Sequence, residues 1–465
     1  MNRTTNHPQA TLLLRHASMV ATMDGTDREL RDASVLIRGQ TIAAIGPAAE
    51  LAVDADQVLD CRDCVVLPGL INTHHHFFQT LTRAVPAGQN AELFDWLMLH
   101  YPIWLALTPE MIRVSATTAM AELLLSGCTT AADHLYLYPN GSTLDDTIEA
   151  AVEIGLRFHA TRGSMSVGQS SGGLPPDALC EQEDAVLRDC ERLIDTWHDG
   201  ADQAMVRIAL APCSPFSVSE GLMRDTRRLA RDRRVRLHTH LAENQRDVDY
   251  TRERFNCTPA QYCERLEWLG DDVWHAHCVK LDSAGIAAFA ASGTGVAHCP
   301  SSNMRLASGI APIRAMLDAG VPVSIAVDGS ASNDGSHLLA EVRQALLLSR
   351  VGGNPAALSA REALQCATRG GARVLGRSDV GVLAPGMAAD LAVFDLNGVG
   401  FAGAGHDPLG ALVFCAPAQA RHCVVNGRVV VREGELQTLD LPAHLARHRA
   451  LARNLVGTDP LRGNA

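Results

Sequence analysis

The middle of the chain, residues 67–378, alternates short apolar runs with stretches of helical periodicity. The clearest helical stretch begins at Thr108-Pro109, a capping residue followed by proline at the first helical position, and runs to Gly127. Strands that alternate with helices form a parallel sheet, and eight is the number of strands that closes a (β/α)8 barrel. The pattern therefore predicts an α/β fold with a TIM barrel at residues 67–378. The apolar runs that we expect to be its strands lie near residues 71–77, 129–135, 157–163, 206–213, 235–242, 273–279, 295–300 and 323–329.

The two ends of the chain, residues 1–66 and 379–465, show short strand-like runs separated by turns. Residues 33–38 and 41–45 flank Gly39-Gln40 and are typical of a hairpin. Residues 422–425 and 428–431 flank Asn426-Gly427, a pair that fits a type I′ turn. Neither end is long enough for a domain of its own. We expect the two ends to form one composite β-sandwich domain, with a solvated helix in the tail from Ala443.

Composition narrows the possible partners and the compartment. A length of 465 residues with 47% hydrophobic content predicts two structural units with a large core. The net charge of −12 argues against nucleic acid and anionic membranes as partners. Thirteen cysteines without a disulfide framework suit a reducing compartment, and Cys61 and Cys64 are expected to be buried thiols. No signal segment or membrane span is apparent, so a cytoplasmic protein is expected.

Polar residues that could carry chemistry follow the predicted barrel strands, at the end where barrel active sites are built. Pro68-Gly69 leads into a short apolar run that ends in three histidines. In a strand His74 and His76 would face the same way, and two such imidazoles can hold a metal ion. An isolated pair of this kind is more often ordinary, but here further residues follow other strands. They are His238, His240 and Glu243 after the fifth strand, His275 and His277 after the sixth, and Asp328 after the eighth.

These residues predict a hydrolytic metal centre. His74, His76, His240 and Asp328 offer three nitrogens and one oxygen to a single divalent ion, with a water molecule in a further position. The nitrogen-rich set favours zinc, and iron binds similar sites. A bound divalent ion lowers the pKa of water, so that hydroxide forms at neutral pH. Glu243 can then protonate a substrate ring nitrogen, Asp328 can accept the proton from water, and His277 can orient the nucleophile or stabilise charge. His75, His238 and His275 are interpreted as packing or supporting residues, with His238 and His275 deeper in the barrel.

These motifs together resemble a known family. Pro68-Gly69 with His74-x-His76, Thr239-His240-Leu-Ala-Glu243, His277-Cys278 and Val327-Asp328-Gly-x-x-Ser-Asn333 resemble the amidohydrolase superfamily. The similarity is greatest to its mononuclear deaminase branch, which includes guanine, cytosine and S-adenosylhomocysteine deaminases and triazine hydrolases. Residues 79–86, 89–94 and 133–141 are most similar to bacterial deaminases of 8-oxoguanine. The resemblance implies one divalent ion, a homo-oligomer and a purine substrate, foremost free 8-oxoguanine converted to urate and ammonia.

Three further residues are candidates for contact with the substrate. Nucleoside deaminases of this branch carry a glutamate for ribose after a Trp-Leu pair, and Trp104 stands at the matching place after Trp96-Leu97. A histidine of their fourth-strand motif is replaced by Cys213. Gln79, three residues past His76, could read a base edge with its amide. These differences favour a flat free base over a nucleoside.

Other functions remain open on the sequence. A guanine- or isocytosine-type deaminase, an S-adenosylhomocysteine-type deaminase or a triazine hydrolase would use the same centre. A binuclear cyclic amidase would need a carboxylated lysine after the fourth strand, but the only lysine, Lys280, follows the sixth. A non-catalytic scaffold is disfavoured by the complete set of candidate residues, and a protein without bound metal would revive that alternative.

Overall fold

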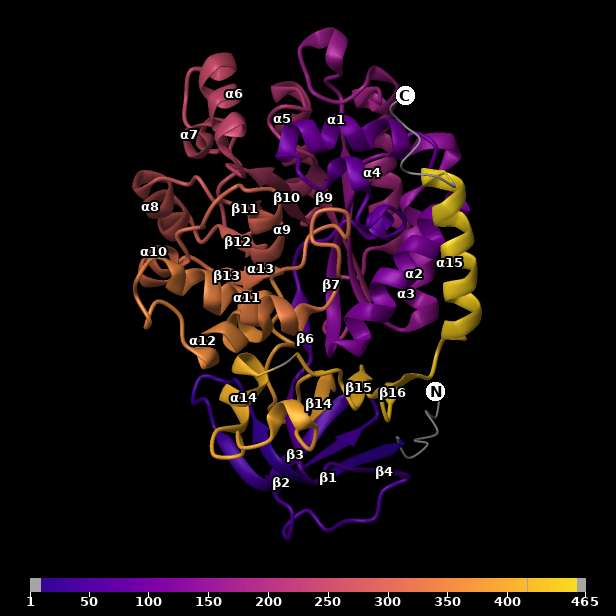
Figure 1. Ribbon diagram of the computed structural model, residues 1–465, viewed down its shortest axis with the longest axis vertical. Helices are drawn as coiled ribbons and strands as arrows, with labels where there is room; N and C mark the ends of the chain where they lie inside the picture. Colours follow the sequence, from indigo (N-terminus) through magenta and orange to yellow (C-terminus); the bar gives the residue numbers. More distant parts are fainter. Residues whose placement is uncertain (1–9, 416, 458–465) are drawn as a thin grey trace, which may run out of the picture.

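The chain forms a nearly closed barrel of eight parallel strands with helices around it, in a computed structural model that describes residues 10–415 and 417–457 (Figure 1). Neighbouring strands pair in chain order from the first to the eighth. The two ends of the barrel sheet meet where Val327 N donates to Asn72 Oδ1 at 2.9 Å and Asp328 N donates to His74 O at 3.1 Å. The predicted (β/α)8 barrel is confirmed. Its strands are β6 (Leu70–Asn72), β7 (Cys128–Leu135), β8 (Arg157–Ser164), β9 (Val206–Pro212), β10 (Arg236–Leu241), β11 (Val273–His277), β12 (Gly295–His298) and β13 (Val323–Ile325).

Several barrel strands end earlier than the apolar pattern predicts, just before the candidate site residues. The strand β6 ends at Asn72 and β13 ends at Ile325, so His74, His76 and Asp328 lie on the loops beyond. Backbone φ is positive at His277 (69°) and Asp328 (64°). A backbone conformation with positive φ costs about 1–3 kcal/mol at each such residue and persists only where the surrounding structure enforces it. The carboxyl ends of the strands therefore leave regular geometry where they turn side chains into the mouth of the barrel.

Helices surround the barrel as the alternating pattern predicts. The predicted helix at Thr108–Gly127 is observed as α2, which begins at Pro109 after the Thr108 side chain accepts a hydrogen bond from Met111 N. The helices are α1 (Leu93–Trp104), α2 (Pro109–Leu125), α3 (Leu144–Ile154), α4 (Glu183–Trp197), α5 (Glu220–Arg233), α6 (Gln245–Phe255), α7 (Pro259–Arg265), α8 (Ser283–Ser292), α9 (Pro300–Arg305), α10 (Ile313–Asp318), α11 (Leu338–Val351), α12 (Ala360–Gln365), α13 (Gly371–Val374), α14 (Pro408–Phe414) and α15 (Leu441–Val456).

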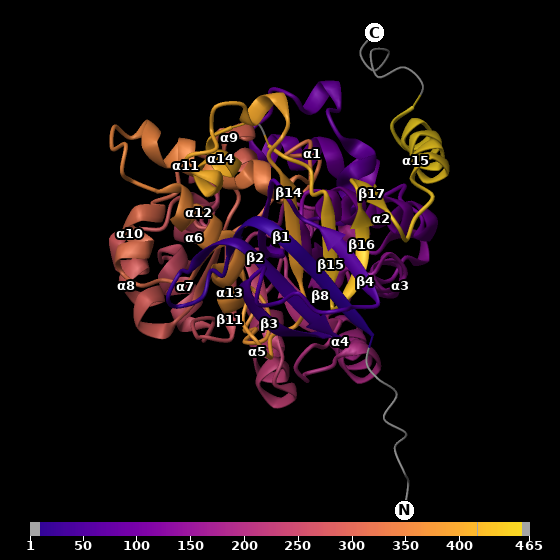
Figure 2. The same cartoon turned by 90° about the horizontal axis from the view of Figure 1, so that it is seen from below.

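The chain ends share a second, mixed sheet of nine strands on one side of the barrel (Figure 2). Both predicted hairpins are confirmed, as β2–β3 and β15–β16. Asn426 and Gly427 have φ of 51° and 82°, which a type I′ turn requires. The strands of this sheet are β1 (Thr11–Ala21), β2 (Glu29–Arg38), β3 (Thr41–Pro47), β4 (Gln57–Asp60), β5 (Cys64–Pro68), β14 (Leu391–Asp395), β15 (His422–Val425), β16 (Arg428–Arg432) and β17 (Glu435–Leu436).

The second sheet curls over a core of its own and is tied closely to the barrel. Ile42 N donates to Met387 O at 2.9 Å, which brings β3 back towards the segment before β14. Gly69 alone separates β5 of this sheet from β6 of the barrel, and a side chain there would collide with Thr129. Arg157 at the start of β8 forms a buried ion pair with Asp390, the residue before β14. The division into domains at residues 66/67 and 378/379 stays a prediction.

The C-terminal helix α15 corrects one expectation. It lies along α2 rather than standing free in solvent (Figure 1). His444 and His448, four residues apart and so on one face, hydrogen-bond to the Thr118 and Thr80 hydroxyls at 2.8 and 2.9 Å. The composition of the tail is polar, but one helical face is docked. No helix within residues 10–415 and 417–457 is both long and apolar enough to span a membrane.

Candidate metal centre and active site

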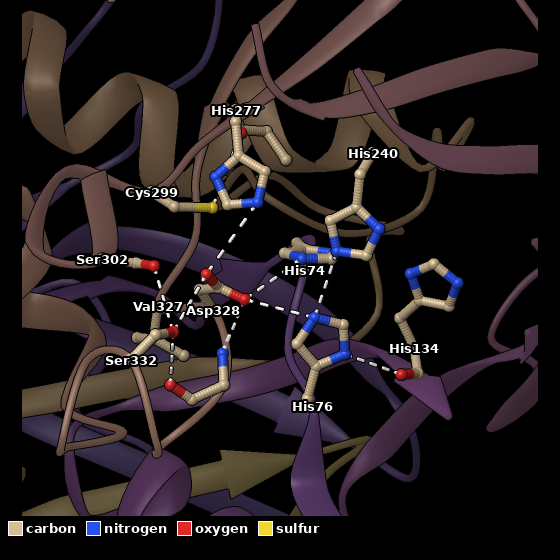
Figure 3. Close-up of polar contacts among 12 residues, drawn as sticks. His74, His76, His134, His240, His277, Cys299, Ser302, Val327, Asp328 and Ser332 are labelled. Atoms are coloured by element: carbon tan, nitrogen blue, oxygen red, sulfur yellow. Dashed lines mark hydrogen bonds and ion pairs between the residues drawn. The ribbon is translucent and has the colours of Figure 1, made fainter. Parts of the chain in front are cut away.

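Four side chains from three parts of the barrel converge at its mouth (Figure 3). Nε2 of His76 lies 3.1 Å from Nε2 of His240, and Oδ1 of Asp328 lies 3.2 Å from Nε2 of His74 and 3.3 Å from Nε2 of His76. All four side chains are buried. The structure thus brings together the three nitrogens and one oxygen that the sequence predicts as ligands of one ion.

Hydrogen bonds to carbonyl groups determine which nitrogen of His76 and of His240 carries the proton. Nδ1 of His76 donates to His134 O, and Nδ1 of His240 donates to Cys213 O, each at 2.7 Å. Because a neutral imidazole carries a single N–H, both Nε2 atoms are lone-pair acceptors. Burial lowers the pKa of His76, and burial together with the neighbouring imidazole of His76 lowers that of His240 to about 3, so both rings are neutral. Two unprotonated nitrogens 3.1 Å apart cannot hydrogen-bond to each other, but both can bind one cation.

The orientation of His74 is set by a chain of two histidines. Nδ1 of His238 donates to Trp274 O at 3.0 Å, so its Nε2 accepts from Nδ1 of His74 at 2.8 Å. Nε2 of His74 therefore carries the third lone pair of the site, and it points towards Asp328. This buried atom has no hydrogen-bond partner among the residues that the structure describes. An imidazole whose second nitrogen is held in this way is the usual arrangement around a protein-bound metal. The residues present therefore fit a divalent ion.

Groups suited to proton transfer lie beside these nitrogens. Nδ1 of His277 donates to Asn303 Oδ1 at 3.0 Å, which leaves its Nε2 as an acceptor. That Nε2 lies 3.5 Å from Oε2 of Glu243 and 3.9 Å from Oδ2 of Asp328. Burial, reinforced by the charges of Asp328 and Asp247, raises the pKa of Glu243 well above its usual range. Glu243 therefore retains a proton that it can donate.

A cavity opens from the converging histidines and is walled mainly by apolar and aromatic side chains. Gln79 and Cys213 line it, as expected, but Trp104 does not. Trp104 is completely buried behind the residues that line the cavity, where its Nε1 donates to Thr82 Oγ1 at 3.2 Å. The lining residues are His76, Gln79, Leu93, Trp96, Leu97, Tyr101, Tyr136, Cys213, Phe216, His240, Glu243, His277, Leu306, Asp328 and Ser332.

The position of Gln79 depends on the glycine that follows Asp328. Oε1 of Gln79 accepts from Ala331 N at 3.2 Å. A Cβ atom at Gly329 would come within 1.9 Å of that oxygen, so only glycine leaves room for the amide. Nε2 of Gln79 is the donor that this arrangement leaves to the cavity.

The supporting histidines divide between the two faces of the barrel wall. His238 lies inside and orients His74, and His75 contacts Ser336 Oγ at 3.0 Å. His275, expected to share the inner face, instead contacts Trp268 O and packs on Phe289 of α8. The positive φ of His277 breaks the two-residue period of β11, so Trp274 and His277 both point inwards. The expectation that His275 lies deeper on the inner face is therefore wrong.

Sequence reasoning missed the aromatic wall. Trp96, Leu97 and Tyr101 come from α1, and Tyr136 and Phe216 come from the loops after β7 and β9. Residues 96, 97 and 101 lie on one helical face, which is the signal that could have identified them. Trp104 lies near that face too, and only the packing of the helix shows that it meets Thr82 instead.

Comparison with known proteins agrees with this geometry. Residues 65–430 match the model of the amidohydrolase family. The chain is 46% identical to an 8-oxoguanine deaminase of Pseudomonas aeruginosa over 95% of this chain and 98% of that protein. It is 37% identical to an isoxanthopterin deaminase of an unknown prokaryotic organism, over 97% and 99%. The crystal structure of a zinc-complexed atrazine chlorohydrolase from Arthrobacter aurescens TC1 superposes with a TM-score of 0.91, at 38% identity over 95% of this chain and all of that one.

Proposed function

The chain belongs to the amidohydrolase family, and we propose on this basis that it is a metal-dependent aminohydrolase that converts free 8-oxoguanine and water to urate and ammonia. The observation that carries the proposal is the convergence of three unprotonated Nε2 atoms and one carboxylate beside a buried, proton-bearing Glu243. This set supplies a cation site, a base and an acid, which are the groups that hydrolytic deamination requires.

We propose that His74, His76, His240 and Asp328 hold one divalent ion and that this ion is zinc. The support is the nitrogen-rich donor set and the zinc found in the related atrazine chlorohydrolase. When bound, the ion would lower the pKa of water and so supply hydroxide at neutral pH.

The residues of this chain then move two protons. Asp328 takes the proton that water loses as its oxygen attacks C2 of the base. Glu243 gives its proton to N3 while C2 becomes tetrahedral, which prevents negative charge from building up on the ring. The proton held by Asp328 passes to the amino group, the C2–N bond breaks and ammonia leaves. The proton of the new C2 hydroxyl returns to the Glu243 carboxylate as the C2 carbonyl of urate forms. Nε2 of His277 lies 3.5 Å from Oε2 of Glu243 and 3.9 Å from Oδ2 of Asp328, where this ring orients the attacking nucleophile or stabilises charge during the attack.

The cavity supports a free base rather than a nucleoside. Glu243 and Asp328 are the carboxylates among its described lining residues, and both have roles in the reaction. No lining carboxylate is therefore left to bind the two hydroxyls of a ribose. Trp96, Tyr101 and Tyr136 offer aromatic surface to a flat ring, and Gln79 Nε2 offers a donor to a ring carbonyl.

The two curated relatives act on bases that share more than the reacting group. Both 8-oxoguanine and isoxanthopterin carry the amino-bearing carbon between two ring nitrogens, and both bear a lactam carbonyl on the second ring. A pocket that hydrogen-bonds such a lactam leaves its own polar groups unpaired when guanine binds, and that mismatch discriminates strongly. We therefore place the preference for 8-oxoguanine over guanine at the end of the pocket away from the metal centre.

Triazine hydrolysis is the second candidate, because a structure of that activity superposes on nearly the whole chain. The deciding experiment measures kcat/KM for 8-oxoguanine and guanine, for the nucleosides of these two bases, and for isocytosine, S-adenosylhomocysteine and a chlorotriazine. Ammonia is recorded for each amine and chloride for the triazine. The proposal expects the free oxidised base to be the best substrate. A higher kcat/KM for a nucleoside or for the chlorotriazine would contradict the substrate assignment.

We also propose a reducing, cytoplasmic location and a homo-oligomeric state. All thirteen cysteines lie within the described residues as free thiols, and Cys61 and Cys64 are both buried. Free thiols in this number support a reducing compartment. Assembly is expected from the family resemblance, and size-exclusion chromatography with light scattering tests it.

A further inference from the structure

A second cavity lies at the opposite end of the barrel strands from the candidate metal centre. It has a volume of about 390 Å3 and is formed where β8, β9 and β10 begin, beside the end of α5. Four arginines line it, with a single aspartate, Asp272. These arginines are Arg207, Arg231, Arg234 and Arg236. We propose that this basal cavity binds a phosphate group, either free or as part of a small organic phosphate.

Two of the arginines are held by carbonyl oxygens and not by a direct ion pair with a carboxylate of the described residues. Arg207 donates to Gly200 O and Ala201 O at 3.2 and 2.9 Å, and Arg236 donates to Asp271 O and Val374 O, the latter at 2.9 Å. Carbonyl oxygens fix a guanidinium in place but leave its full positive charge. Among the described residues, no carboxylate forms an ion pair within 4 Å of either group. The Nε atoms of both are buried and lack a hydrogen-bond partner within the same part of the chain.

Three of the acidic groups around the cavity are already engaged by other arginines, whereas Asp199 and Asp202 near Arg207 and Asp271 near Arg236 act on these arginines from beyond ion-pair distance. Asp272, which lines the cavity, is bound by Arg227 at 2.6 Å. Asp379 is bound by Arg377 at 2.6 Å, and Glu267 is bound by Arg231 at 2.6 Å. Removal of a charged group from water is unfavourable. Burial is the main cause that lowers the pKa of Arg236 to about 10; the charges of Asp272 and Asp271 oppose this effect, and the charge of Arg207 adds to it. An anion in the cavity would remove this penalty.

Ordinary structural explanations cover only part of the cluster. Arg231 and Arg234 lie at the C-terminal end of α5, where positive side chains complement the helix dipole. Arg207 and Arg236 lie on strands, so the dipole does not explain them.

A neutral donor completes the site. Nδ1 of His198 accepts from Ile208 N at 3.1 Å, so its Nε2 carries the proton, and His198 lines the same cavity.

The geometry favours phosphate over a carboxylate. Guanidinium groups bind tetrahedral oxyanions through several N–H donors at once, and several oxygens can be shared among Arg207, Arg236 and His198. The volume exceeds that of a phosphate ion, and Ile208, Ala230 and Val235 provide an apolar side for the rest of an organic phosphate.

The test compares thermal unfolding of the metal-loaded, full-length protein in inorganic phosphate, in ribose 5-phosphate and in chloride at matched ionic strength. The wild type is expected to show a saturable rise in Tm with either phosphate over chloride. The double variant Arg207→Gln/Arg236→Gln should lose that rise. Arg228→Gln, which removes the same charge from an exposed position on α5, should keep it. A stronger response to the sugar phosphate identifies an organic phosphate as the ligand, and equal responses identify free phosphate.

Two results would overturn the proposal: no rise over chloride in the wild type, or the same rise in the double variant. The second result would place the anion elsewhere, including at the metal centre. If the double variant does not fold, Arg234→Asn decides in the same way. Asparagine tolerates the φ of 55° at this position, and a response equal to that of the wild type would count against the site.

Discussion

The Nε2 atoms of His76 and His240 lie 3.1 Å apart and neither carries a proton, because Nδ1 of each ring donates to a backbone carbonyl. Two lone pairs held face to face in a buried site repel each other. A cation between them converts that repulsion into two favourable contacts, so the fold is arranged in advance for an ion.

The first prediction concerns that ion. His240→Ala should remove most of the bound metal, as measured by elemental analysis of the purified protein, because one of three nitrogen donors is lost. His275→Gln is the matched control, since His275 is equally buried but contacts Trp268 O outside the centre. Full metal occupancy in His240→Ala would show that the ligand assignment is wrong.

The second prediction concerns the orientation of His74. His238→Phe keeps a ring against Trp274 but removes the acceptor for His74 Nδ1, so metal affinity should fall about 10- to 100-fold. His238→Gln offers an amide oxygen as a replacement acceptor and should fall less. Competition with a metal chelator measures both. Equal affinities in the two variants would mean that His238 only packs.

The third prediction separates proton transfer from metal binding. Glu243→Gln should keep its metal but lose about two to four orders of magnitude in kcat, because glutamine has no proton to give to the ring. Glu253→Gln, on the exposed side of α6, is the control for the same chemical change. A rate near that of the wild type would place the acid elsewhere.

The fourth prediction distinguishes the two tryptophans of α1. Trp96 lines the cavity, so Trp96→Ala should raise KM for the base roughly 5- to 150-fold, the equivalent of about 1–3 kcal/mol of stacking. Trp104→Phe should leave KM unchanged, because Trp104 lies behind the wall. The reverse pattern would restore the original assignment of Trp104 to the substrate.

The fifth prediction concerns stability and pH. Burial raises the pKa of Glu341 from 4.5 to about 7, so the folded protein keeps a proton there that the unfolded chain loses. Between those two values the native state binds more protons, and stability falls as pH rises, by about 1.4 kcal/mol per pH unit at most. The stabilisation of the folded state by the proton on Glu341 is complete below pH 4.5 and lost above pH 7. Tm measured from pH 5 to 8 should fall less in Glu341→Gln than in the wild type and in Glu253→Gln. Parallel curves for all three would contradict this interpretation.

Much of the fold and the converging site could be predicted from the sequence, because both depend on local pattern. The apolar runs and the residues that follow them place His240 and Asp328 at the same end of the barrel without knowledge of any contact. The wall of the cavity could not be predicted in this way. Whether Trp96 or Trp104 reaches the substrate depends on how α1 packs on the barrel, and a helical period leaves several choices for that rotation.

The error over His275 has a different cause. A period of two holds only while a strand stays regular, and the chain departs from it at His277. Function requires that departure, since it turns His277 towards Glu243. The sequence pattern therefore fails where the chemistry is placed. The proton positions on His76 and His240 were also beyond sequence reasoning, because their carbonyl partners, His134 O in β7 and Cys213 O just after β9, lie far away in the sequence.

The pairing of β5 with β14 has a consequence for how the protein is made. Ribosomes synthesise β5 more than 300 residues before its partner, as Cys64–Pro68 pairs with Leu391–Asp395. Until the later segment emerges, one edge of β5 lacks its partner strand. Along the chain, Gly69 alone separates β5 from β6, the first strand of the barrel. The first barrel strand is thus anchored by a segment that leaves the ribosome long after it. Nascent chains that stall before β14 should be the ones that chaperones hold and proteases remove.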